Sequence, residues 1–106
     1  MAKSYITPQA FDTNFKTVEV ANNTATVSIK SGNRLRATIS ANTTFNLSPA
    51  NLPTGQVLLL RLKISTSGAT PSFSGATVNG TVITTANATN LIVFINEGET
   101  IKGFVL

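Results

Sequence analysis

The chain contains no histidine and no cysteine, and its acidic residues are limited to Asp12, Glu19, Glu97 and Glu99. Without histidine, a serine nucleophile has no ordinary general base, and no Ser-x-x-Lys sequence offers a lysine in its place. Without cysteine, disulfide bridges and thiolate metal sites are excluded. A calcium ion takes about six oxygen ligands, more than the Glu97–Glu99 turn supplies. We therefore expect no enzyme activity, no cofactor and no metal site.

Long apolar segments are also missing. Apolar runs such as residues 57–60 are far too short to cross a bilayer, and no apolar stretch typical of a signal peptide follows residues 1–5. The net charge is +4, yet only 11% of the residues are charged. Such sparse positive charge favours acidic partners in general, whereas nucleic-acid binders carry denser basic stripes with interleaved aromatic residues. We expect synthesis in the cytoplasm and contact with neither membrane nor nucleic acid.

Thr, Ser and Asn, by contrast, make up 37 of the 106 residues, and 42% of the chain is hydrophobic. This is enough apolar material for the core of one domain. The hydrophobic residues alternate with a period of two, as in half-buried strands, and no segment shows the period of a helix. In residues 57–65, for example, Leu58, Leu60, Leu62 and Ile64 share one side. The expected strands are residues 24–30, 34–39, 43–47, 57–65, 77–85, 91–95 and 101–106.

Connections between these strands indicate an all-β fold. Residues 31–33 read Ser-Gly-Asn and predict a β-hairpin between the first two strands. Asn79-Gly80 interrupts the fifth expected strand as either a hairpin turn or a bulge. Residues 91–95 are apolar on both faces, which is typical of a central strand. Short strands at this spacing favour a β-sandwich or jelly-roll-like single domain over residues 16–106.

The N-terminal segment, residues 1–15, has a proline, isolated aromatic residues and no clean period. Two interpretations remain open. The segment is either an extended arm that packs on a neighbouring subunit or a lead-in strand that covers the domain's own core. In the first case Tyr5, Phe11 and Phe15 contact the partner.

A short motif, Ala-Asn-x-Thr, occurs at residues 21–24, 41–44 and 86–89, each time before an expected strand. Asn tolerates left-handed backbone angles and bonds its own chain, so the motif predicts a turn. Because the copies are 20 and 45 residues apart, we interpret the motif as turn chemistry and not as a structural repeat.

Two groups of residues are candidates for partner contacts. Lys30, Arg34 and Arg36 cluster around the predicted hairpin turn, where they either dock on an acidic surface or, as we prefer, form a solvated edge that discourages aggregation. The second group consists of apolar residues that would be exposed to solvent unless a second sheet or another subunit covers them. They are Val57 and Leu59, on the second side of residues 57–65, and Phe104 and Leu106 at the C-terminus.

Residues 39–47 read Ile-Ser-Ala-Asn-Thr-Thr-Phe-Asn-Leu, and residues 55–64 read Gly-Gln-Val-Leu-Leu-Leu-Arg-Leu-Lys-Ile. This resembles a pattern of tailed-bacteriophage virion proteins, in which such strands precede a Ser/Gly/Thr-rich loop, a late apolar strand, a short turn and a terminal strand. The corresponding segments here are residues 65–75, 90–95, 96–99 and 101–106. The resemblance covers about residues 35–106 and consists of a strand and turn pattern without a catalytic signature.

The resemblance implies a capsid decoration (cement) protein that binds the major capsid protein on the capsid surface of the virion. The same resemblance implies that copies of the chain associate with one another, with a trimer favoured. It also implies an alternative, a tail-fibre, spike or baseplate module that binds a host surface glycan. The chain departs from the fibre version because it lacks Trp and Tyr near its last two strands and has no long fibrous extension.

Overall fold

The computed structural model describes residues 15–106, so the expected contacts of Tyr5 and Phe11 and the choice between arm and lead-in strand lie outside the described residues. The described chain forms nine strands and one short 3-10 helix, arranged in two sheets. The six-stranded sheet contains, in spatial order, β1 (Lys16–Thr17), β3 (Arg34–Ile39), β5 (Val57–Ile64), β8 (Thr89–Asn96), β9 (Ile101–Val105) and β7 (Thr77–Asn79). The three-stranded sheet contains β2 (Thr24–Thr26), β4 (Thr43–Asn46) and β6 (Pro71–Ser74).

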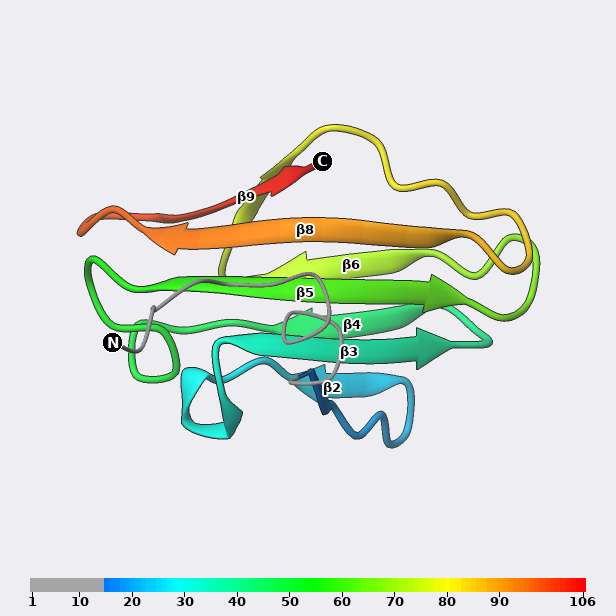
Figure 1. Ribbon diagram of the computed structural model, residues 1–106, viewed down its shortest axis with the longest axis horizontal. Coiled ribbons are helices and arrows are strands. Elements are labelled where there is room, and N and C mark those ends of the chain that lie inside the picture. The colour runs from blue at the N-terminus through cyan, green and yellow to red at the C-terminus, as the bar shows by residue number, and fades with distance from the viewer. Residues whose placement is uncertain (1–14) are drawn as a thin grey trace, which may run out of the picture.

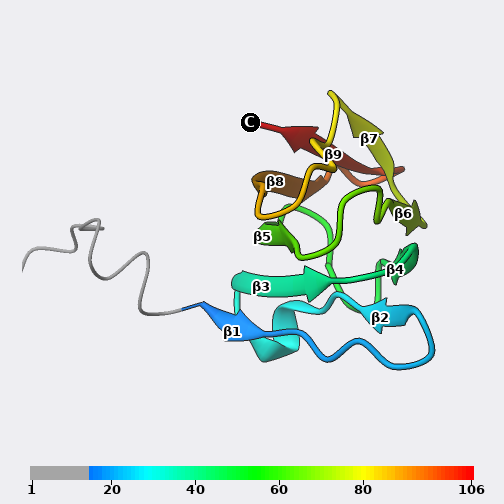
Figure 2. The same cartoon turned by 90° about the vertical axis from the view of Figure 1, so that its right-hand side faces the viewer.

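From β1 to β6 the chain alternates between the two sheets (Figure 1; Figure 2). In this part of the chain, each crossover between parallel neighbours of one sheet contains a strand of the other sheet. Consequently β1, β3 and β5 pair in parallel, and so do β2, β4 and β6. Parallel neighbours need a long connection, and here the opposite sheet provides it. Among the strands of residues 15–106, only β8 has antiparallel neighbours, β5 and β9.

The expectation of an all-β chain is confirmed, but the jelly-roll connectivity is not. A jelly roll is built from antiparallel strands, whereas five of the seven strand pairs in the described part of the chain are parallel. Hydrophobic periodicity predicts where strands lie along the chain, but it does not distinguish a parallel neighbour from an antiparallel one.

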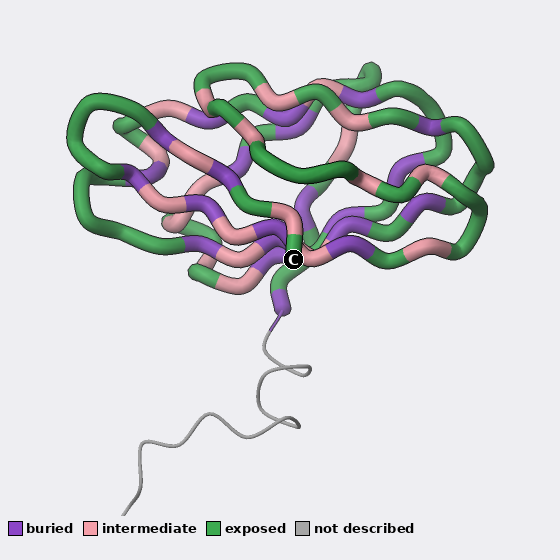
Figure 3. Tube along the Cα trace, turned by 90° about the horizontal axis from the view of Figure 1, so that it is seen from above, coloured by how far each residue is buried: buried purple, intermediate pink, exposed green. Residues whose placement is uncertain are grey.

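The core lies between the two sheets, and the buried positions alternate along the strands (Figure 3). Leu58, Leu60, Leu62 and Ile64 of β5 are all fully buried, as their alternation predicts. Phe73 of the three-stranded sheet contacts Phe94 of the six-stranded sheet, with ring centroids 5.5 Å apart. One hydrophobic core therefore holds both layers.

The predicted hairpin between residues 24–30 and 34–39 is wrong. β2 and β3 belong to different sheets, and the 3-10 helix η1 (Ile29–Ser31) lies in the connection between them. The Ile29 N–H donates to the Asn51 carbonyl (2.8 Å), which directs the chain away from a return along β2. Gly32, with φ +126°, ends the helix. The Ser-Gly-Asn sequence is thus a helix stop rather than a hairpin turn.

Two other segments differ from the sequence prediction. Residues 65–75, expected as a loop, contain β6, whose first residue is Pro71 at the edge of its sheet, a position that tolerates a missing N–H. The strand expected over residues 77–85 ends at Asn79, and Gly80 follows with φ +100°. Neither a hairpin turn nor a bulge follows, because β7 pairs in parallel with β9 and a loop leads on to β8.

The Ala-Asn-x-Thr motif does mark left-handed turns in its first and third copies, where Asn22 and Asn87 have φ of 54° and 69°. In the second copy Asn42 instead accepts a hydrogen bond from the Thr70 N–H through its side chain (3.0 Å). The first two copies lie beside each other, since Thr24 and Thr44 are direct partners on the parallel strands β2 and β4. Their asparagines nevertheless differ in conformation, as expected for local turn chemistry.

Candidate functional site

The outer face of the six-stranded sheet collects large apolar side chains. Successive side chains of a strand point to opposite faces of the sheet. In β5, β8 and β9, one set therefore points into the core and the other set points outward. We call the apolar residues of this face the apolar block: Val57, Leu59, Leu91, Val93, Ile95, Phe104 and Leu106. Three of them are strongly exposed, Val57 at 46%, Phe104 at 40% and Leu106 at 75%.

Strand register makes this block continuous. Leu59 lies opposite Val93, and Val93 lies opposite Phe104, so one row of apolar side chains crosses three strands. Val57 and Ile95 form a second row beside it. Partners in a sheet are about 5 Å apart and next rows about 7 Å apart, close enough for large side chains to touch.

Basic residues border the apolar block on β3 and β5. We call Arg34, Arg36, Arg61 and Lys63 the basic corner. Arg34 lies opposite Leu59, and Arg36 lies directly opposite Arg61. Like charges that lie directly opposite each other on neighbouring strands repel.

The segment around β1 orients both of these arginines. The Nε of Arg36 donates to Thr17 Oγ1 at 3.1 Å. The guanidinium carbon of Arg61 lies 5.3 Å from the centroid of the Phe15 ring, a cation–π contact. Phe15 itself is buried.

The structure brings most of the described candidate contacts together. Six of them belong to the outer face: Arg34, Arg36, Val57, Leu59, Phe104 and Leu106. Phe15 contacts the same face through Arg61. Lys30 does not join the others, because it is exposed in η1, within the crossover from β2 to β3.

The sequence analysis did not include five residues of this surface among the candidate contacts: Arg61, Lys63, Leu91, Val93 and Ile95. The signal was present, since Arg61 and Lys63 share a side of β5 with Val57, and residues 91–95 are apolar on both sides. What was missing was the register between β5 and β8, which places these residues beside one another.

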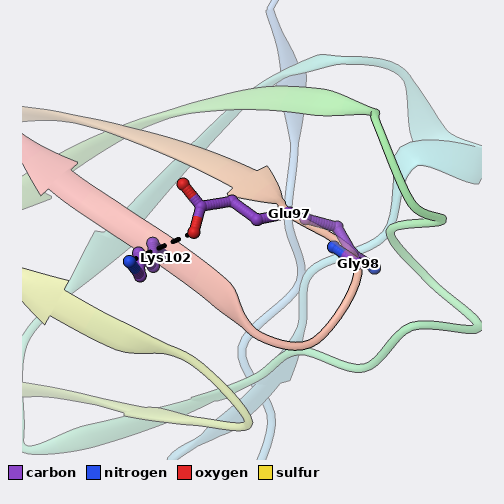
Figure 4. Close-up of polar contacts among 4 residues, drawn as sticks. Glu97, Gly98 and Lys102 are labelled. Atoms are coloured by element: carbon purple, nitrogen blue, oxygen red, sulfur yellow. Dashed lines mark hydrogen bonds and ion pairs between the residues drawn. The ribbon is translucent and has the colours of Figure 1, made fainter.

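At the end of β8, Glu97 forms an ion pair with Lys102 at 3.1 Å (Figure 4). Both side chains are about half exposed, so the pair contributes little to stability. The Gly98 N–H donates to the Asn96 side-chain oxygen at 2.8 Å and closes the turn. Within residues 15–106 no three His, Cys, Asp or Glu side chains lie close enough to hold a metal ion.

Two surface depressions are formed by small and polar residues. One, of about 350 Å³, lies beside the β8–β9 turn and includes Gly75, Asn96 and Glu99. The other, of about 420 Å³, lies between the edge strands β1 and β2. In the described part of the chain, every buried side-chain N or O atom has a hydrogen-bond partner. Neither depression therefore presents an unsatisfied buried group to a ligand.

No helix of the described residues is long and apolar enough to cross a membrane. Comparison with protein-family models, curated proteins and solved structures finds no match to this chain.

Proposed function

We propose that this chain is a non-catalytic structural protein that docks on a larger protein assembly through the outer face of its six-stranded sheet. The apolar block is the observation that carries the proposal. Exposed apolar patches that are continuous and rimmed by charge mark protein contacts in soluble proteins. Four strands about 4.8 Å apart and up to eight residues long form a face of roughly 20 by 25 Å. This is on the order of the patch that one partner contributes to an interface of standard size.

The resemblance to tailed-bacteriophage virion proteins supports the capsid as this assembly. In this proposal the chain is a decoration protein that binds the major capsid protein on the outside of the shell. Its architecture is a β-sandwich, and the shared core of the two sheets supports that class. Copies self-associate, with a trimer favoured. Because the shell is symmetric, the stabilising free energy of each apolar contact is repeated at every equivalent position.

The alternative, a tail module that binds a host glycan, rests on a different surface. The outward side chains of the three-stranded sheet are hydroxyl and amide groups: Thr24, Thr26, Thr44, Asn46, Ser72 and Ser74. These groups can hydrogen-bond sugars, but sugar rings also need exposed aromatic faces. Among the described aromatic residues only Phe104 is exposed, and it lies on the other sheet. The decoration role is therefore better supported.

Immunogold electron microscopy of virus particles from the strain that carries this gene tests the proposal. We expect label over the capsid shell. Val93→Asp, which places a charge in the centre of the apolar block, should strongly reduce the label, whereas Ser72→Asp on the opposite sheet should not. Absence of the wild-type chain from particles would refute the proposal, and label confined to the tail would favour the alternative.

A further inference from the structure

An Asn-Gly sequence, Asn79-Gly80, lies at the end of β7, on the edge of the six-stranded sheet. No other asparagine of the sequence is followed by glycine. The backbone nitrogen that follows an asparagine can attack the side-chain carbonyl carbon and close a succinimide ring. Glycine favours this attack because it has no Cβ atom to crowd its nitrogen. The fold then determines whether the nitrogen is available for the reaction.

At this position the fold leaves the backbone nitrogen available. Asn79 is the exposed last residue of β7, and Gly80 follows it with φ +100°. No group of residues 15–106 accepts a hydrogen bond from the Gly80 N–H. A nitrogen without such a bond attacks without first losing a stabilising interaction.

Asn46 provides the contrast within the same molecule. It too is the exposed last residue of a strand, β4. The N–H of the next residue, Leu47, donates to the Ser74 carbonyl at 2.8 Å, and the Leu47 side chain is buried. The following N–H is also bonded to a backbone carbonyl after five other asparagines: Asn23, Asn42, Asn51, Asn87 and Asn96. Asn79 thus combines a glycine neighbour with a free nitrogen.

We infer that Asn79 is a site of spontaneous deamidation. The Gly80 nitrogen bonds to the Asn79 Cγ atom, and the Cγ–Nδ2 bond breaks. The Gly80 amide proton passes through water to the leaving group, which departs as ammonia. Water then opens the ring at either of its carbonyl groups, so residue 79 becomes aspartate or isoaspartate. Water is the only co-reactant.

The new carboxylate would lie at the rim of the apolar block. Val78 packs against the core, so its neighbour Asn79 points to the outer face, where it lies opposite Phe104. Covering an unpaired carboxylate with apolar groups of a partner costs free energy. Deamidation should therefore weaken docking through this face. This consequence rests on the proposed docking function, whereas the modification itself does not.

Peptide mass spectrometry during incubation of the full chain at mildly alkaline pH tests the site. We expect deamidation at Asn79 to be at least about tenfold faster than at Asn46, a difference of about 1.4 kcal/mol in the barrier. The same incubation in concentrated urea measures the effect of the fold. Urea should raise the Asn46 rate by a larger factor than the Asn79 rate, because only the Leu47 N–H is bonded in the native protein. Equal native rates, or equal acceleration by urea, would overturn the inference.

Two variants test the effect on docking. Asn79→Asp carries the charge of the product from the start, and Asn79→Ser is the neutral control that cannot form the ring. We expect Asn79→Asp to bind isolated virus shells about fivefold more weakly or worse, roughly 1 kcal/mol, and Asn79→Ser to bind as the wild type does. Wild-type affinity of Asn79→Asp would refute the effect on docking and leave the modification site standing. Deamidation at Asn79 in a wild-type chain that does not bind the shells would refute the capsid role alone.

Discussion

Gly103 of β9 lies directly opposite Phe94 of β8, and the Phe94 ring covers the space that a side chain at residue 103 would occupy. A Cβ atom there would be 2.7 Å from the ring carbon Cε1 and 3.1 Å from a methyl group of Val78. Because Phe94 also contacts Phe73 of the other sheet at 5.5 Å, its ring joins three strands, β6, β8 and β9. The packing of both layers thus depends on the absence of a side chain at residue 103.

Gly103→Ala should destabilise the protein by about 1–3 kcal/mol, because the buried ring has little room to move. Phe94→Leu alone should also destabilise it, since the ring's contacts are lost. In the double variant the smaller Leu should accommodate the Ala methyl group, so the two losses should not add. Urea denaturation of the four proteins measures the coupling. Strict additivity would show that the ring does not restrict residue 103.

Asn90 acts as a clamp on the loop between β7 and β8. This buried side chain accepts from the Ile83 N–H at 2.9 Å and donates to the Ile83 carbonyl at 3.0 Å. Asn90→Leu keeps the approximate volume but leaves both backbone groups without this partner, which should cost about 1–3 kcal/mol. Hydrogen exchange should show a faster Ile83 amide.

Asn46→Ala is the matched control for that variant, because Asn46 is exposed on the outer side of β4. It should leave both the unfolding free energy and the Ile83 exchange rate nearly unchanged. Unchanged Ile83 exchange in Asn90→Leu would contradict the clamp.

The sequence predicts where strands begin and end better than it predicts which strands pair with each other. β5 and β9 lie within one residue of their expected bounds, because alternation along a strand depends on which residues are apolar. The pairing of β2 with β4, and of β3 with β5, depends on long crossovers that leave little local signal. The Ser-Gly-Asn turn therefore suggested a hairpin where the chain in fact changes sheets.

The candidate docking face was also predictable only where its residues belong to a single strand. The outward positions of β5 and the apolar residues 104–106 were recognisable as surface that needs a cover, since they follow from alternation within one strand. The arginine pair was not, because Arg36 and Arg61 are 25 residues apart and meet only through the parallel register of β3 and β5. The contribution of Thr17 to this site depends on the further pairing of β1 with β3.

Two glycines with similar backbone angles allow steric and conformational costs to be separated. Gly75 has φ +86° and Gly68 has φ +90°, a region in which Ala is disfavoured by about 1–2 kcal/mol. A Cβ atom at Gly68 would meet nothing within 4 Å, whereas one at Gly75 would overlap the Leu47 carbonyl oxygen. That oxygen belongs to backbone, which cannot rotate away as a side chain can.

Gly68→Ala should therefore lower the unfolding free energy by about 1–2 kcal/mol, the conformational term alone. Gly75→Ala should cost clearly more, because the β6–β7 turn must move away from Leu47, whose N–H is bonded to the Ser74 carbonyl at 2.8 Å. Thermal and urea unfolding of the two variants supply the comparison. Equal losses would mean that the turn relaxes freely, and that the close approach of residues 47 and 75 does not hold β4 against β6.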